Sequence, residues 1–132
     1  MDEQTIEVRR DIDVILARNV GRKMANEIGF GELDQTRITT AISELARNIV
    51  IHANRGKVVI REIQKGDRRG IEVVCTDDGP GIEDIEAALR DGYTTAGGLG
   101  IGMTGAKRLM DEFHVESVVG VGTTVIVKKW LR

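Results

Sequence analysis

The sequence predicts an α+β fold, a two-layer sandwich in which helices cover one face of a mixed, mostly antiparallel sheet. Two long segments with helical apolar spacing come early, and the apolar period then changes from 3.6 to 2 residues. The later strands occur mainly as two hairpins with glycine-containing turns. The 132 residues form one expected domain, 1–132, large enough to bury roughly two thirds of its unfolded surface.

The composition argues against several classes of protein. With a net charge of −2 the chain has no excess of basic residues, so we expect no nucleic-acid partner. Cys75 is the single cysteine, which excludes an internal disulfide and a thiolate metal cluster. No apolar run approaches the roughly 20 residues that span a bilayer, and the first residues do not resemble a signal peptide. We therefore expect no membrane association and a cytoplasmic location.

Alternating residues predict a first strand over residues 5–9, and a helix follows it. Asp11 or Asp13 is expected to cap this helix, which ends near Gly29. Its large apolar residues recur at helical spacing and are expected to face the core. They are Ile12, Ile15, Leu16, Val20, Met24 and Ile28.

A second helix is predicted from about Asp34, and Gly56 ends the connection after it. Its buried stripe is expected to comprise Ile38, Ala41, Ile42, Leu45 and Ile49. Glu44 and Asn48 are four residues apart, so they share one helical face. A projection at about 100° per residue places both on the shoulder of the apolar stripe, where a side chain meets a pocket between helix and sheet.

The second half of the chain is predicted to hold two hairpins separated by helices. The alternating segments are 57–64, 70–76, 115–119 and 123–130. A turn over residues 66–70 joins the first pair, and a Gly-Val-Gly turn joins the second. Helices are expected over residues 82–90 and 102–113.

The segment Asp-Asp-Gly-Pro-Gly over residues 77–81 ends an apolar strand. By itself such a segment is typical of a turn. In a binding site, Asp77 at the strand end accepts a hydrogen bond from an exocyclic amine, while Gly79 and Gly81 let the backbone approach a flat ring.

Residues 97–105 contain near-matches to two nucleotide-binding motifs. The G-x-G-x-x-G of a dinucleotide fold fails because no strand precedes it, and a Walker A loop fails because Lys107 comes one place late. What remains is a glycine-rich loop that leads into a helix whose first amides bind phosphate. No basic residue lies between Arg90 and Lys107, so backbone amides and a metal ion would neutralise the phosphates. The roles of Lys107 and Arg108 stay open.

Four motifs together resemble the Bergerat-fold ATPases, the superfamily of gyrase, histidine kinases and MutL. They are E-x-x-x-N (Glu44, Asn48), D-x-G-x-G (Asp77, Gly79, Gly81), the lid glycines (Gly98, Gly100, Gly102) and G-T (Gly122, Thr123). Within that superfamily, the segments 37–48, 107–113 and 128–132 look similar to the small bacterial anti-sigma-factor and switch kinases that phosphorylate protein serines.

The resemblance implies ATP and Mg²⁺ as ligands and gives each motif a role. Asn48 would help to hold Mg²⁺, Asp77 would accept the adenine amino group, and Thr123 would support that end. The lid glycines would surround the β- and γ-phosphates. Glu44 would be the general base for phosphoryl transfer.

The resemblance also implies a biological setting. The chain would be a serine/threonine kinase of a bacterial stressosome partner-switching module, transferring the γ-phosphate to STAS-domain antagonist proteins. Once released, it would bind and activate a serine phosphatase. A homodimer is compatible with the resemblance. Two alternatives stay open: an anti-sigma factor that phosphorylates its own STAS antagonist, and a nucleotide-gated binding module that transfers little phosphate.

Overall fold

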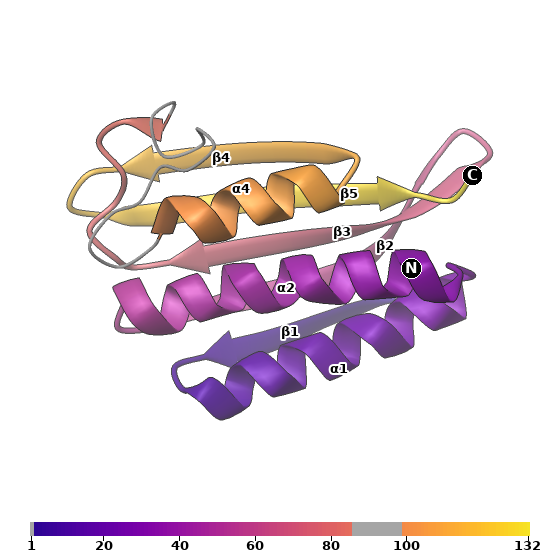
Figure 1. Ribbon diagram of the computed structural model, residues 1–132, viewed down its shortest axis with the longest axis horizontal. Helices are drawn as coiled ribbons and strands as arrows, with labels where there is room; N and C mark the ends of the chain where they lie inside the picture. Colours follow the sequence, from indigo (N-terminus) through magenta and orange to yellow (C-terminus); the bar gives the residue numbers. More distant parts are fainter. Residues whose placement is uncertain (1, 86–98) are drawn as a thin grey trace.

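The computed structural model describes residues 2–85 and 99–132, which form two layers (Figure 1). Within these residues, five strands make one sheet and three helices cover one of its faces, so the predicted α+β sandwich is confirmed. The elements are β1 (Glu3–Val8), α1 (Asp11–Ile28), α2 (Glu32–His52), β2 (Gly56–Lys65), β3 (Arg68–Asp77), α4 (Leu99–Leu109), β4 (Glu112–Val118) and β5 (Gly122–Trp130).

The strands follow the order β1-β2-β3-β5-β4. All four pairings are antiparallel, so the described part of the sheet lacks the parallel pair that a mixed sheet would need. Because β5 lies between β3 and β4, the end of β3 meets the start of β5, and Asp77 pairs with Thr123. The topology thus brings together two motifs that are more than 40 residues apart in the sequence.

The core lies between the sheet and α2, which packs between α1 and α4. The predicted buried stripe of α2 is confirmed, since each of its five apolar residues is at most 2% exposed. Inward-facing residues of the strands complete the core; those below 2% exposure are Val8, Val58, Ile60, Ile71, Val73 and Val127. The helix that carries Glu44 and Asn48 is therefore the most firmly packed of the three.

The predicted apolar face of α1 is partly wrong. Ile12, Ile15 and Leu16 are 56%, 43% and 51% exposed. The helix is turned so that a stripe which includes small residues faces inward; it comprises Val14, Ala17, Gly21, Met24, Ala25 and Ile28. A side chain at Gly21 would collide with Ile42, so this glycine allows α1 and α2 to approach closely. The prediction counted only large apolar residues and missed the small ones.

The start of α1 and the first strand also differ slightly from the prediction. Residue 9 lies outside β1, and Arg10 occupies the N-cap position. The carboxylate of Asp13 accepts the backbone N–H groups of Arg9 and Arg10 at 2.9 and 3.0 Å. Asp13 thus satisfies the amides ahead of the helix from within its first turn, as in a capping box.

The helix predicted over 102–113 begins earlier and ends earlier, as α4. At its end, the ammonium of Lys129 donates to the carbonyl of Leu109 at 2.8 Å, and the N–H of Asp111 donates to the carbonyl of Lys128 at 2.9 Å. These contacts turn the chain out of the helix, and Phe113 belongs to β4 instead. Most of the helix predicted over 82–90 lies outside the described residues.

The first hairpin is longer than predicted, because its turn is tighter. β2 and β3 extend to Lys65 and Arg68, and only Gly66 and Asp67 form the turn. Gly66 has a φ of 64°, a conformation that glycine adopts without strain. The turn of this hairpin therefore lies at the opposite end of β3 from Asp77, which pairs with Gly56 at the open end.

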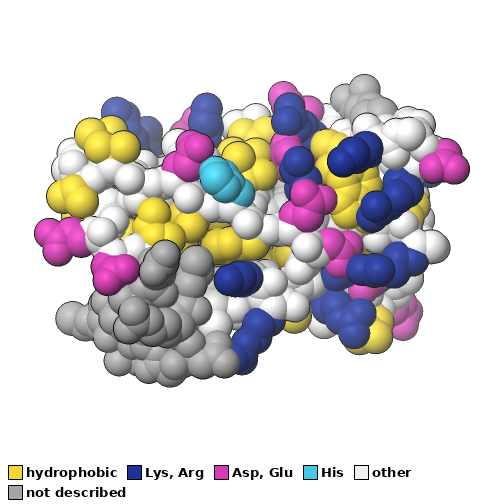
Figure 2. All heavy atoms as spheres, turned by 90° about the horizontal axis from the view of Figure 1, so that it is seen from above, with side chains coloured by type: hydrophobic (Ala, Val, Ile, Leu, Met, Phe, Trp, Pro, Cys, Tyr) yellow, Lys and Arg dark blue, Asp and Glu magenta, His cyan; other side chains and the backbone are white. Residues whose placement is uncertain are grey.

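Acidic and basic side chains are interspersed on the face shown in Figure 2, and hydrophobic side chains appear in several separate places. A cation–π contact joins a basic to an aromatic side chain: the guanidinium carbon of Arg68 lies 4.9 Å from the centroid of the Trp130 ring. No described helix combines the length and the apolarity that a bilayer crossing requires.

Candidate functional site

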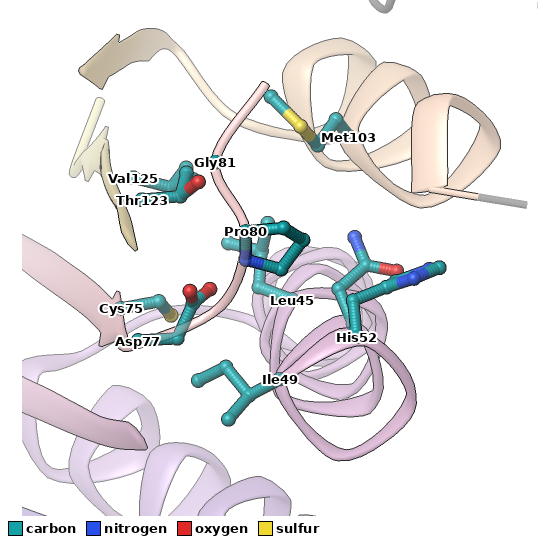
Figure 3. Close-up of a pocket in the computed structure, with 11 residues that line it drawn as sticks. Leu45, Ile49, His52, Cys75, Asp77, Pro80, Gly81, Met103, Thr123 and Val125 are labelled. Carbon is teal, nitrogen blue, oxygen red and sulfur yellow. The ribbon is translucent and has the colours of Figure 1, made fainter. Parts of the chain in front are cut away.

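A cavity of about 60 Å³ lies between α2 and the sheet, beside the end of β3 (Figure 3). The residues lining it come from α2, α4, β3, β5 and the loop after β3. They are Leu45, Asn48, Ile49, His52, Cys75, Asp77, Pro80, Gly81, Met103, Thr123 and Val125. Four of the predicted site residues, Asn48, Asp77, Gly81 and Thr123, therefore share one cavity.

Asn48 supplies a polar atom that lacks a partner. Its side-chain amide nitrogen is buried and makes no hydrogen bond within the described residues. A buried amide without a partner costs free energy, roughly 1–3 kcal/mol, and most such groups in folded proteins are satisfied. Asn48 is held on α2 by buried neighbours on both sides, Leu45 and Ile49. The amide is thus positioned in advance for a polar ligand.

Asp77 is a half-buried carboxylate at the end of β3. One of its oxygens accepts the backbone N–H of Gly79 at 2.8 Å. Burial raises the pKa of the Asp77 carboxyl above its ordinary value, although hydrogen bonds from the N–H groups of Gly79 and Thr123 oppose that rise. A partly desolvated acceptor beside an apolar cavity is suited to an amine donor on a flat ring.

Thr123 is held in place by a residue that sequence reasoning missed. The hydroxyl of Ser117 lies 2.9 Å from the Thr123 hydroxyl, donates to the carbonyl of Gly122 at 3.2 Å and accepts the N–H of Ile82 at 2.7 Å. Ser117 and Thr123 face each other across β4 and β5. The predicted turn over residues 120–122 would place Val119 opposite Thr123, whereas Val118 pairs with Gly122 in the structure, so the contact depends on the observed register.

The two glycines Gly81 and Gly122 allow close contacts around the strand ends. Gly81 has a φ of 80°, and a Cβ there would lie 2.6 Å from the carbonyl oxygen of Val118. Gly122 has a φ of 155°, and a Cβ there would collide with the carbonyl of Asp77. Side chains at either position would push the loop, the hairpin and β3 apart. Approach of the Gly81 backbone to a ring stays a prediction.

Asp78 and Gly79 face away from the cavity lining. Asp78 accepts the N–H groups of Asn54 and Arg55 at 3.2 and 3.1 Å, so it fastens the end of α2 to the end of β3. Gly79 lines a separate groove with Ile51 and other residues. A Cβ on Gly79 would lie 3.0 Å from the backbone carbonyl of His52, which accounts for the absence of a side chain.

Glu44 lies outside the cavity lining, one turn before Asn48 on α2. Its side chain is 34% exposed and forms an ion pair with Arg47 at 3.3 Å. An exposed pair of this kind contributes little to stability, about 0.3–0.5 kcal/mol, so the carboxylate is easily released from it. Glu44 is therefore open to an approaching molecule, while Asn48 faces the cavity.

The three lid glycines are only partly covered by the structure. Gly98 lies outside the described residues, and Gly100 and Gly102 belong to the first turn of α4. α4 packs against α2, and Met103 reaches the cavity. The first turn of α4 thus lies close to the helix that carries Asn48. Lys107 and Arg108 are exposed.

Further lining residues were not assigned to the site from the sequence. Cys75 is buried, and it also lines the cavity. Burial and the nearby Asp77 raise the pKa of its thiol to about 12, so it stays protonated and unreactive at neutral pH. His52 and Met103 also line the cavity, and no sequence motif marks either of them.

The described residues contain no cluster of three or more His, Cys, Asp or Glu side chains that would hold a metal ion by themselves. A metal at this site would need oxygen ligands from a bound molecule. The amide of Asn48 fits such a shared site, because its oxygen is a hard ligand and its nitrogen is free to donate to the same molecule.

Comparison with known families and sequences gives a consistent result. Residues 7–129 match the family of the histidine kinase-like ATPase domain. The chain is 47% identical over 131 residues to the serine/threonine-protein kinase RsbT of Bacillus subtilis (strain 168), covering 99% of this chain and 98% of the relative. It is 40% identical over 100 residues to the anti-sigma F factor of Thermoanaerobacter sp. (strain X514), covering 71% of this chain and 68% of the relative.

Solved structures share the fold at lower identity. The RsbU and RsbW domains of Rv1364c from Mycobacterium tuberculosis align with a TM-score of 0.69 and 20% identity, covering 100% of this chain and 34% of that chain. The catalytic domain of histidine kinase ThkA aligns with a TM-score of 0.57 and 17% identity, covering 98% of both chains.

Proposed function

The chain belongs to the histidine kinase-like ATPase domain family and is an ATP-dependent serine/threonine kinase of the partner-switching type, and we propose that its substrate is a STAS-domain antagonist protein. The acceptor is a serine or threonine hydroxyl of that antagonist, in a stressosome-type assembly. The 47% identity to RsbT over nearly the whole chain supports this proposal. After release from the antagonist, the kinase binds and activates a serine phosphatase.

The proposed nucleotide position follows from the cavity. Asp77 accepts the adenine amino group, with Thr123 and its partner Ser117 beside it. The phosphates extend past Asn48 toward the first turn of α4, where Gly100 and Gly102 let backbone amides approach them. The observation that carries this proposal is the unpartnered buried amide of Asn48, in the same cavity as the Asp77 carboxylate.

Asn48 is the protein ligand that we propose for magnesium, through its side-chain oxygen. Magnesium bound with ATP neutralises charge that develops on the phosphates. The buried neighbours Leu45 and Ile49 fix the helix on both sides of Asn48, which orients the amide without further cost. This arrangement leaves the amide nitrogen as a donor to a phosphate oxygen.

Glu44 is the proposed general base. In the reaction the acceptor oxygen forms a bond to the γ-phosphorus of ATP, and the bond from that phosphorus to the β–γ bridging oxygen breaks, leaving ADP. The proton of the acceptor hydroxyl passes to the Glu44 carboxylate. The exposure of Glu44 supports this role, because a protein substrate must reach the base from outside the cavity.

Glu44→Gln is the variant that tests the base. We expect its affinity for ATP to stay within about twofold of wild type and its rate of transfer to fall roughly 100-fold or more. Purified STAS-domain proteins of the same organism serve as acceptors, with γ-labelled ATP and mass spectrometry to locate the phosphorylated residue. Glu32→Gln, an exposed position at the start of the same helix, is the matched control.

The outcomes separate the proposed functions. Transfer at the wild-type rate by Glu44→Gln would contradict the base assignment. Tight ATP binding by wild type without any phosphorylated STAS protein would favour the nucleotide-gated binding module instead. For the second role, a serine phosphatase that gains no activity on addition of the kinase would contradict the proposed activation.

An anti-sigma factor is the second candidate, and the 40% identity to an anti-sigma F factor favours it. Such a protein would bind a sigma factor and phosphorylate its own STAS antagonist. Co-purification of a sigma factor with the chain, released on addition of the unphosphorylated STAS protein, would support this candidate over the first. Sedimentation of the purified chain would show at the same time whether it forms the homodimer compatible with either role.

A further inference from the structure

Ser117 joins three segments of the chain beside the Asp77 end of the cavity. It is a half-buried residue of β4. Its hydroxyl contacts Ile82 in the loop after β3, and it contacts Gly122 and Thr123 at the start of β5. Of these four described residues, only Thr123 lines the cavity. An influence of Ser117 on a bound molecule would therefore pass through Thr123.

The partners of Ser117 determine which group donates in each contact. A serine hydroxyl has one hydrogen to donate and two lone pairs that accept. The carbonyl of Gly122, 3.2 Å away, can only accept, so the single hydrogen of Ser117 is directed there. The N–H of Ile82, at 2.7 Å, occupies one lone pair of the Ser117 oxygen. The contact of 2.9 Å with Thr123 therefore uses the second lone pair, and the Thr123 hydroxyl is the donor.

This orientation leaves the Thr123 hydroxyl as an acceptor toward a ligand. Because its hydrogen points to Ser117, only its lone pairs remain for a bound molecule. Asp77 pairs with Thr123 across β3 and β5, and the ionised Asp77 carboxylate can only accept. In Figure 3 both side chains lie on the same side of the loop that carries Pro80. Two acceptors thus lie next to each other at this end of the cavity.

We propose that Ser117 is a specificity-determining residue, which makes the kinase reject purine nucleotides that carry a carbonyl oxygen in place of the adenine amino group. The amino group of adenine donates to Asp77 and is not repelled by a second acceptor. A carbonyl oxygen, as in hypoxanthine or guanine, would face two acceptors and lose its hydrogen bond to water without a replacement. Ser117 is a positioning residue, because it acts through Thr123. The inference rests on the proposed function, in which Asp77 accepts the adenine amino group.

The other polar groups of the cavity lining are engaged or come from another wall. Asn48 and His52 are one turn apart on α2, whereas Asp77 and Thr123 are at the strand ends. The backbone N–H of Thr123 is already directed to the Asp77 carboxylate. Among the described residues at the strand ends, the Thr123 hydroxyl is thus the group that could turn and donate to a carbonyl oxygen. Its bond to Ser117 prevents this.

Ser117→Ala tests the inference through the choice between ATP and inosine triphosphate (ITP), which has a carbonyl oxygen where ATP has the amino group. Calorimetric titration in the presence of magnesium gives the Kd of each nucleotide. We expect the ratio of the ITP Kd to the ATP Kd to fall about tenfold or more, because the released Thr123 hydroxyl donates to the carbonyl oxygen. Ser117→Thr keeps the hydroxyl and should retain the wild-type ratio. Ser43→Ala is the matched control, since it removes a hydroxyl that donates to the carbonyl of Thr39 within α2.

The double variant Ser117→Ala/Thr123→Val separates this role from a structural one. Loss of the Ser117 hydroxyl also leaves the N–H of Ile82 without its acceptor, so we expect a lower melting temperature in both variants. A looser loop weakens the binding of both nucleotides alike and leaves their ratio unchanged. Valine has the shape of threonine but no hydrogen to donate, so the double variant should recover a ratio about tenfold above that of Ser117→Ala. If Ser117→Ala is unfolded at the assay temperature, Ser117→Cys, whose thiol is a weak hydrogen-bonding group, should shift the ratio in the same direction.

The outcomes distinguish this inference from the proposed function. An unchanged ratio in Ser117→Ala, or equal affinities of wild type for ATP and ITP, would overturn the inference while leaving the proposed nucleotide site intact. A ratio that falls equally in Ser117→Ala and in the double variant would also overturn it, because the Thr123 hydroxyl would then not be responsible. No binding of ATP by wild type would contradict the proposed nucleotide position and this inference together.

Discussion

At the scale of single residues, Asp77 combines a cost in stability with a proposed role in binding. Its pKa is raised in the folded protein, so the folded state binds the proton more tightly than the unfolded state. The contribution of this proton binding to folding stability is therefore fully present below pH 3.8, the ordinary pKa of an aspartate. It is lost as the pH rises through the raised pKa of Asp77. At neutral pH the ionised Asp77 lowers the free energy of unfolding.

Asp77→Asn removes that cost and keeps an oxygen that accepts the N–H of Gly79. We expect the variant to have a higher free energy of unfolding than wild type at pH 7, and the difference to shrink as the pH falls toward 3.8. Urea unfolding of the nucleotide-free protein at several pH values measures both. Asp67→Asn, in the exposed turn between β2 and β3, is the control. A variant less stable than wild type at pH 7 would contradict the raised pKa.

Single residues also show where sequence reasoning ends. The motifs predicted Asn48, Asp77 and Thr123 together, because their residue types and order are distinctive, and the structure places all three around one cavity. Ser117 belongs to no motif. Its importance comes from the register of β4 and β5, which places it opposite Thr123. A contact that depends on strand pairing becomes visible only when the pairing is known.

At the scale of elements, Lys129 fixes the end of α4. Its side chain is 7% exposed, donates to the carbonyl of Leu109 at 2.8 Å, and lies 3.6 and 4.0 Å from the carboxylates of Asp111 and Asp34. Lys129→Met fills the same space but leaves the helix end and both carboxylates without this partner. We expect the free energy of unfolding to fall by about 2–4 kcal/mol in urea unfolding.

Lys107→Met is the control for that prediction, since Lys107 is exposed on the same helix and should change stability by at most about 0.5 kcal/mol. Equal stability of both variants would show that the buried ammonium does not hold α4. The same contact explains why the helix ends at Leu109, although apolar spacing predicted that it continues to residue 113. The spacing of apolar residues within the helix contains no information about Lys129, which lies on a distant strand and ends the helix.

The bounds of helix α1 were predicted from the sequence, but its orientation on the sheet was not. Its boundaries were predicted to within a few residues, because a capping carboxylate and Gly29 mark them. Its orientation was not, because small residues occupy much of its buried face. Ala17 and Ala25 are fully buried, and Gly21 lies against Ile42 of α2. Large apolar residues were assumed to be core residues.

At the scale of the whole molecule, the site exists because the fold joins segments that are distant in sequence. α2 brings Asn48, the central strand β3 brings Asp77, and β5 brings Thr123. A row of charged side chains braces the open face of the sheet, with Arg61 2.6 Å and Lys128 3.7 Å from the carboxylate of Glu72. The α+β class followed from the change of apolar period, whereas the position of β5 between β3 and β4 had no signal in local sequence.

Calorimetric titration with ATP and magnesium tests the central claim most directly. Wild type should bind, and Asp77→Ala should bind about tenfold more weakly or worse, because a buried amine loses its acceptor at a cost of roughly 1–3 kcal/mol. Asp67→Ala, at the opposite end of β3, should bind like wild type. No heat of association with wild type, or equal affinities of wild type and Asp77→Ala, would contradict the assignment of this cavity to ATP.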